Sequence, residues 1–188
     1  MPQSWYALCV KSNRERLVSE TAKEKGYEEF LPIYRSRRRW SDRYKDIDLP
    51  LFPGYVFCRF DIANRLPLLS IPGVAYIVGV GKTPVPLADQ EIAAIRAVTQ
   101  SGLSLQPWPF VDIGQAVLIE DGPLRGVVGV VINTKGAQHL IVSITLLQRS
   151  VAVDVDRRWA RHSDPQPTWN STASLKKDPE RLSMGRPF

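Results

Sequence analysis

The chain has 188 residues, of which 44% are hydrophobic, so it is long enough for two small domains, each with a core. Its net charge of +6 is compatible with a nucleic-acid partner. The two cysteines are too far apart for a CxxC zinc motif, and no apolar run reaches the 18 residues of a membrane helix. Because the charged N-terminus also lacks a signal-peptide core, we expect a cytoplasmic monomer with no membrane contact.

Residues 1–102 predict a mixed α and β module. An apolar run at 4–10 has strand character, and the helix that follows ends near Gly26. Further strands are expected at 29–34, 54–60 and 74–78, with a short helix near Pro67 and a longer one from Asp89 to about Gln100. This order predicts an α/β sandwich, in which helices pack on a sheet.

Two neighbouring features of this module point to binding. Residues 35–45 hold six lysines and arginines but one acid, and we expect them to form a hairpin or loop. The segment 49–57 combines a Pro-Gly turn with an aromatic strand. Alternation along 54–60 places Tyr55 and Phe57 on one face and Val56 and Cys58 on the other, and either face could be the core.

The second half of the chain predicts a small β domain. Residues 103–110 hold two prolines and no periodicity, so we expect a linker. Residues 111–160 alternate apolar and polar positions between turn signals, which predicts a five-stranded β-barrel. Residues 161–188 lack an apolar period and predict a disordered basic tail.

The ordered set of motifs resembles the NusG family of transcription elongation factors. The start Trp5-Tyr6-Ala7-Leu8, the LFPGYVF segment and the Ile71-Pro72-Gly73-Val74 step are similar to its N-terminal domain. The stretch from Gly114 to Val131 is similar to a KOW motif. The resemblance covers about 150 residues. It implies an α+β chain: a NusG N-terminal domain followed by an SH3-like KOW barrel, with KOW residues Gly114, Val117, Ile119, Gly122, Pro123, Gly126 and Gly129.

The resemblance also implies the partners of the first domain. An apolar face would dock on the β′ clamp helices of RNA polymerase, through residues matching Phe52, Tyr55, Phe57, Val80, Ile92 and Ile95. Non-template DNA at the upstream edge of the bubble would contact a basic set, composed of Lys11, Arg37, Arg38, Arg39, Trp40, Arg43, Asn64 and Arg65. The threonine run with which the RfaH relative reads DNA is missing here, which weakens the expectation of sequence-specific reading.

For the barrel, the family resemblance implies a second partner, a ribosomal protein or Rho. General NusG proteins carry a Phe-Gly-Arg turn at the contact, and this chain has Leu147-Gln148-Arg149. We expect the contact at Leu146, Leu147 and Arg149. RfaH can refold this module as a helical hairpin, but the valine-rich runs and Gly129 of this chain favour a stable barrel.

The expected function is regulation of elongation, as a specialised paralogue of the RfaH, LoaP and UpxY kind that suppresses pausing and termination on long operons. The alternatives are a general NusG that couples polymerase to Rho or the ribosome, and a ribosome-associated KOW protein that binds RNA. No enzyme is expected, since His139 and His162 have no catalytic or metal-binding companions in the sequence, and we expect no cofactor or metal.

Overall fold

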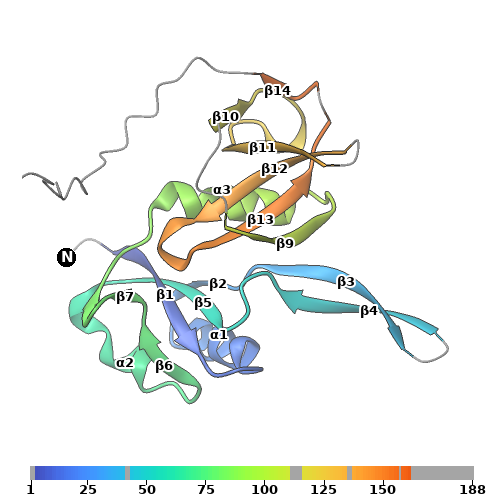
Figure 1. The fold of residues 1–188 in the computed structure, drawn as a ribbon. Coiled ribbons are helices and arrows are strands. Elements are labelled where there is room, and N and C mark those ends of the chain that lie inside the picture. Colours follow the sequence, from blue (N-terminus) through green and yellow to red (C-terminus); the bar gives the residue numbers. More distant parts are fainter. Residues whose placement is uncertain (1–2, 41–42, 111–115, 135–136, 157, 162–188) are drawn as a thin grey trace, which may run out of the picture.

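The computed structural model describes residues 3–40, 43–110, 116–134, 137–156 and 158–161. The first domain is built on an antiparallel sheet of strand order β2-β5-β1-β6 (Figure 1). The strands are β1 (Ser4–Val10), β2 (Glu28–Phe30), β5 (Tyr55–Phe60) and β6 (Val74–Ile77). Within the described ranges, no helix is long and apolar enough to cross a membrane.

Both faces of this sheet are buried. On one face, Val56, Cys58 and Phe60 pack in a cluster with residues of α1 (Glu15–Glu24) and α2 (Leu66–Leu69). On the other face, Phe57 belongs to a cluster that includes Ile95 of α3 (Asp89–Gln100). The alternation along β5 therefore separates two packed faces, and neither set of side chains is left wholly to solvent.

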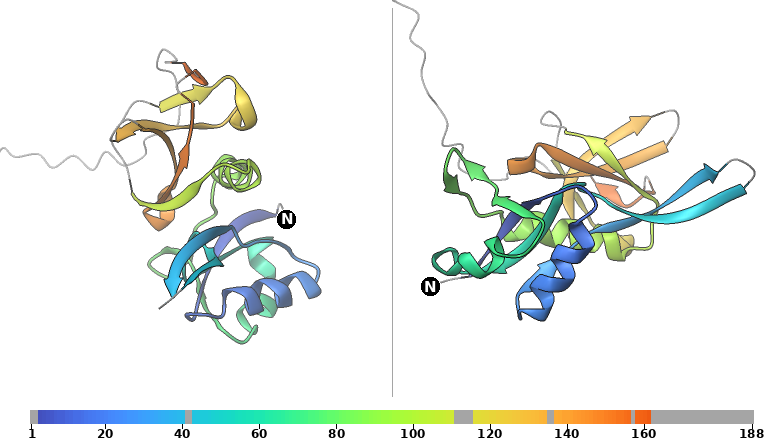
Figure 2. Two further views of the ribbon diagram at one scale, coloured as in Figure 1. Left: turned by 90° about the vertical axis from the view of Figure 1, so that its right-hand side faces the viewer. Right: turned by 90° about the horizontal axis from the view of Figure 1, so that it is seen from below.

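Two hairpins extend from this sandwich. The longer consists of β3 (Ile33–Trp40) and β4 (Arg43–Pro50), and it projects away from both domains (Figure 2). The expectation of a hairpin or loop at residues 35–45 is therefore met by a hairpin. The shorter one pairs β7 (Gly79–Val80) with β8 (Thr83–Pro84). A 3-10 turn, η1 (Ile62–Asn64), follows β5.

The second domain is a curved antiparallel sheet of order β14-β10-β11-β12-β13-β9. Its strands are β9 (Leu105–Pro109), β10 (Ala116–Ile119), β11 (Val128–Thr134), β12 (Ala137–Ile144), β13 (Arg149–Asp154) and β14 (Ala160–Arg161). The short turns are η2 (Gly122–Leu124) and η3 (Thr145–Leu147). The α+β class, with an N-terminal sandwich followed by a small β domain, is confirmed.

The segment 103–110 differs from the linker that we expected. Residues 105–109 form β9, which pairs with β13 from Leu105 opposite Val153 to Pro109 opposite Arg149. Strand β9 lies at the edge of the sheet, where a proline costs no ladder hydrogen bond on its solvent side. The two prolines are therefore compatible with a strand at this position.

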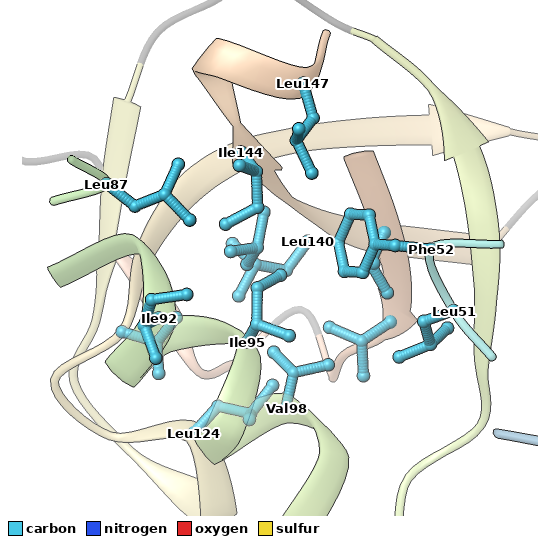
Figure 3. Packing of buried hydrophobic residues seen from close by; sticks show 14 of the residues in the cluster. Leu51, Phe52, Leu87, Ile92, Ile95, Val98, Leu124, Leu140, Ile144 and Leu147 are labelled. Atoms are coloured by element: carbon cyan, nitrogen blue, oxygen red, sulfur yellow. The ribbon is translucent and has the colours of Figure 1, made fainter. Parts of the chain in front are cut away.

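Helix α3 joins the two domains. It lies between the first sheet and the barrel in both Figure 1 and Figure 2. Its buried side chains, Ile92, Ile95 and Val98, face Leu140 and Ile144 of β12 (Figure 3). The apolar core of the barrel and one face of the first domain thus form one continuous cluster.

Candidate partner-binding surfaces

The residues expected to dock on polymerase gather mostly in this shared cluster. Phe52, Phe57, Ile92 and Ile95 are all buried there, and Tyr55 is half-buried against it. Val80 is separate, because it lies on β7 with 72% of its surface exposed. Five of the six side chains therefore lie together in this cluster, and the barrel covers most of the surface that they form.

The expected second-partner turn lies at the same interface. Leu147 is 8% exposed and belongs to the cluster, close to Phe52 in Figure 3. Leu146 is half-buried against the cluster, and Arg149 is exposed. Gln148 adopts the left-handed conformation with φ of 50°, which is the conformation a glycine adopts most easily.

A hydrogen bond crosses between the two domains beside this turn. The backbone N–H of Thr145 donates to Oε1 of Glu91 at 3.0 Å. Glu91 lies in the first turn of α3, and Thr145 opens η3 of the barrel. This hydrogen bond adds a directional polar contact to the apolar packing between the two domains.

The Pro-Gly turn before β5 is held by a residue that sequence reasoning missed. Glu15 begins α1, is buried, and accepts a hydrogen bond from the backbone N–H of Gly54 at 2.9 Å. Gly54 has a φ of 84°, which strongly favours glycine. The two residues are 39 positions apart, so no local pattern could reveal the pair.

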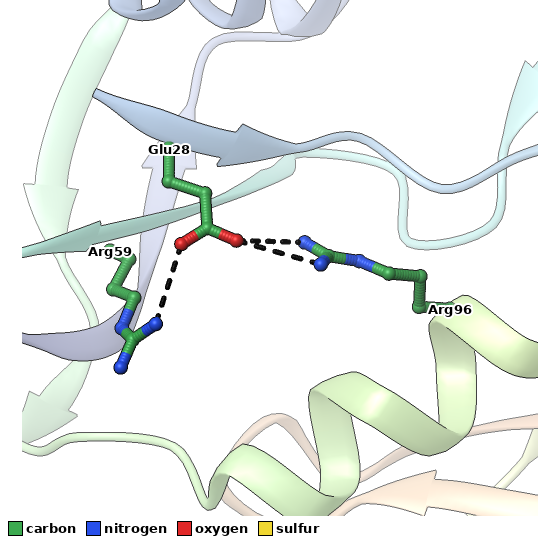
Figure 4. Close-up of polar contacts among 3 residues, drawn as sticks. All are labelled: Glu28, Arg59 and Arg96. Atoms are coloured by element: carbon green, nitrogen blue, oxygen red, sulfur yellow. Dashed lines mark hydrogen bonds and ion pairs between the residues drawn. The ribbon is translucent and has the colours of Figure 1, made fainter. Parts of the chain in front are cut away.

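A second unpredicted contact ties α3 to the sheet. The carboxylate of Glu28 accepts from Arg96 on α3 at 3.4 Å and pairs with Arg59 on β5 at 3.5 Å (Figure 4). The guanidinium of Arg96 also lies 5.4 Å from the ring centre of Trp5 and 5.2 Å from that of Phe30. This network orients the helix that carries Ile92 and Ile95.

The expected nucleic-acid residues fall into two groups. Arg37, Arg39 and Arg43 are exposed on the long hairpin, where Arg38 and Trp40 also lie in β3. Exposed Lys11 follows β1 at the end of the sheet where Cys9 pairs with Tyr55.

Asn64 and Arg65 are exposed beyond the opposite end of β5, where Ser4 pairs with Phe60. The two ends are separated by about the length of a six-residue strand, roughly 20 Å. A single patch therefore does not unite the whole set.

The residues of the expected KOW motif lie in strand β10, in the turns that follow it and at the start of strand β11. Val117 and Ile119 of β10 are buried, and Pro123 lies in η2. Gly122 has a φ of 77°, and a Cβ there would lie 2.7 Å from the ring of Trp159. Gly126 has a φ of 87°, and a Cβ on Gly129 would overlap the carbonyl oxygen of Ile141. Gly114 lies outside the described residues.

Two ionisable groups of the first domain have raised pKa values. Burial, with a smaller contribution from Glu29, raises the pKa of Cys58 to about 12. A hydrogen bond with Cys9 raises the pKa of the exposed Tyr76 phenol. Over the part of the chain that the structure describes, no group of three or more His, Cys, Asp or Glu residues could hold a metal ion.

Comparison with known proteins agrees with this architecture. The family model described as transcription termination factor NusG matches residues 3–96. The transcription termination/antitermination protein NusG of Escherichia coli K12 is 31% identical over 134 residues, covering 69% of this chain and 71% of the relative. Its counterpart in Campylobacter jejuni is 24% identical and covers 80% of this chain and 92% of the relative.

A solved structure, described as domain interaction in Thermotoga maritima NusG, covers 86% of this chain and 98% of its own, at 22% identity and a TM-score of 0.52. This similarity supports the fold. The relatives are transcription factors, which confirms that the chain is not an enzyme. On the family match and the Escherichia coli relative together, the chain belongs to the NusG family of transcription termination and antitermination proteins.

Proposed function

We propose that this chain binds the clamp helices of RNA polymerase through the apolar face of its first domain and regulates elongation. The observation that carries the proposal is that Phe52, Phe57, Ile92 and Ile95 form one apolar surface, covered largely by a second domain. A surface covered by a separate domain can be uncovered without unfolding the domain that bears it. Once uncovered, it is the kind of apolar patch that marks an interface.

Polymerase binding then requires the barrel to move away from α3. The apparent affinity equals the intrinsic affinity multiplied by the fraction of molecules in which the face is open. Leu147 and the bond between Glu91 and Thr145 hold the closed arrangement. Weakening contacts on the barrel side should therefore strengthen polymerase binding, although these contacts are not themselves part of the docking face.

The test is a titration of core RNA polymerase with full-length variants. Leu147→Ala removes apolar contact from the barrel side and should tighten binding several-fold, whereas Phe52→Ala removes a docking side chain and should weaken it. Val128→Ala is the matched control, because Val128 lies on the barrel but is 52% exposed. If Leu147→Ala leaves the affinity unchanged while Phe52→Ala lowers it, the barrel is not a removable cover. If neither changes it, the docking face is elsewhere.

The finer role that we propose is processive antitermination on specific long operons. The turn Leu147-Gln148-Arg149 supports a specialised factor, because it departs from the Phe-Gly-Arg of general family members. Transcript profiling of a deletion strain tests this role: loss of distal transcripts from a few long operons agrees with it, and a genome-wide change in Rho-dependent ends favours a general NusG. Retention of ribosomes without polymerase in a pull-down would favour the ribosome-associated alternative.

A further inference from the structure

Helix α3 is attached to both domains of the chain. Before its first turn, the backbone N–H of Leu87 donates to the carbonyl oxygen of Trp5 at 2.8 Å, which ties the N-terminal end of the helix to β1. Its C-terminal end at Gln100 leads directly into the barrel, where the carbonyl oxygen of Ser104 accepts from the amide of Asp154. When the barrel moves away, this C-terminal end is the part of α3 that the backbone bond to β1 does not hold.

The apolar side chains of α3 do not by themselves fix the helix to one domain. Ile92, Ile95 and Val98 belong to a buried cluster that contains residues of the first sheet and of the barrel. They face Leu140 and Ile144 of the barrel, so a barrel that departs uncovers part of their surface (Figure 3). Because apolar contact is non-directional, this packing alone does not specify where the helix lies once the barrel has gone.

Arg96 supplies contacts that are directed to the first sheet. Trp5 stands opposite Arg59 and Arg59 opposite Glu28, so these three residues share the face of the sheet that α3 covers. The guanidinium of Arg96 donates to Oε1 of Glu28 at 3.4 and 3.5 Å and lies 5.4 Å from the ring centre of Trp5 (Figure 4). It also lies 5.2 Å from the ring centre of Phe30. A single side chain of α3 therefore contacts strands β1 and β2, which lie on opposite sides of β5.

We propose that Arg96 is a positioning residue, which holds α3 on the first sheet after the barrel has moved away. The inference rests on the proposed function, because it concerns the helix that presents Ile92 and Ile95 to polymerase. In the closed arrangement the barrel also holds α3, through apolar packing and the bond between Glu91 and Thr145. In the open arrangement these contacts are gone, and the guanidinium accounts for a larger share of what keeps the helix over β1 and β2.

The effect of losing Arg96 therefore depends on the state of the molecule. Polymerase binds the fraction of molecules that are open with α3 in place, so the apparent affinity follows that fraction. In a closed molecule the loss changes little, because the barrel still holds the helix. Once Leu147→Ala has opened the molecule, the same loss lets α3 leave the sheet and lowers the fraction that can dock.

Hydrogen exchange of the full-length protein measures where α3 lies after opening. The amide of Thr145 reports opening, because its acceptor Glu91 lies in the first turn of α3. The amides of residues 97–100 report detachment of the helix, because a free helix of this length is unstable in water. In the unaltered protein we expect the Thr145 amide to exchange several-fold faster than those of 97–100. In Arg96→Ala the two should exchange at similar rates, while the amides of β1 stay as slow as before.

Titration of core RNA polymerase with the same full-length proteins measures the consequence for docking. Because the protein is closed in the structure, Arg96→Ala alone should change the apparent affinity less than about two-fold. In the Leu147→Ala background it should remove at least about half of the several-fold gain, since the opened molecules then lack an ordered α3.

Two further variants in the Leu147→Ala background serve as comparisons. Arg96→Lys should keep part of the gain, because it retains the charge near Glu28 but not the planar guanidinium. Arg59→Ala is the matched control, because it removes the other arginine that pairs with Glu28 but lies on β5. It should leave the gain intact.

Three results would overturn the assignment. Unchanged exchange at residues 97–100 in Arg96→Ala means that the guanidinium does not hold the helix. Faster exchange throughout β1 and β5 means that Arg96 supports the whole domain, and equal losses of affinity with and without Leu147→Ala mean the same. Failure of Leu147→Ala to tighten polymerase binding contradicts the docking proposal instead, and the exchange pattern then decides the role of Arg96 by itself.

Discussion

Truncating Phe57 to alanine should destabilise the first domain strongly, whatever it does to polymerase binding. Its side chain is 0% exposed. Its ring packs 5.6 Å from that of Phe52 and 6.2 Å from that of Phe30, measured between centroids. Removing a buried phenylalanine in this way costs about 3–5 kcal/mol of unfolding free energy, and the two ring contacts favour the upper part of that range.

This cost is large compared with the whole stability of a domain, which is about 5–15 kcal/mol. Urea unfolding of the full chain measures it, and hydrogen exchange of the β1 and β5 amides assigns the loss to the first domain. Phe57→Leu is the matched control, because a hydrophobic swap of similar volume costs less than about 1.5 kcal/mol. Tyr55→Ala should cost less than Phe57→Ala, because Tyr55 is only half-buried.

A loss below about 1 kcal/mol for Phe57→Ala would refute the reasoning, because mutations away from packed sites typically cost no more than that. Phe57 would then be a surface side chain that only the partner covers. A large loss together with unchanged polymerase affinity in the folded fraction would instead restrict the docking role to Phe52, Tyr55 and the α3 residues.

Three further outcomes follow from single contacts. Gly129→Ala should destabilise the barrel by about 1–3 kcal/mol, because the new Cβ meets the carbonyl of Ile141; thermal unfolding measures this. Glu15→Ala should cost about 1–3 kcal/mol and speed exchange of the Gly54 amide, which loses its acceptor. Cys58, whose pKa of about 12 keeps the thiol protonated at pH 8, should resist iodoacetamide until the domain unfolds, and fast labelling of the native protein would contradict its burial.

Local pattern was enough to predict strands β10 to β13 of the barrel, but it missed β9 and left the basic segment open between a hairpin and a loop. The residues of the predicted strands alternate between apolar and polar positions or flank a turn, and that information lies within a few neighbours. Strand β5 shows what such local information cannot predict. The alternation of side chains along the strand correctly places Phe57 and Cys58 on opposite faces. It cannot show that both faces are covered, because the covering elements α1, α2, α3 and the barrel lie far away in the sequence.

The expected linker shows a different limit. Two prolines within 105–109 argue against a central strand, and sequence alone could not place this segment at an edge. The contact of Glu15 with Gly54 and the network around Glu28 were likewise invisible, since each joins elements far apart in sequence. The family resemblance was enough to name candidate docking residues, but it could not predict that the second domain covers them.

Because β9 belongs to the barrel, little free chain connects the domains. Helix α3 ends at Gln100, and the carbonyl of Ser104 already accepts from the amide of Asp154. Four fully extended residues reach roughly 14 Å, whereas peeling β9 away frees residues 101–109 and extends the reach to roughly 30 Å. Pairing of β9 therefore limits how far the barrel can move from α3. A ligand of the barrel that lies beyond this reach would have to supply the free energy that separates β9 from β13.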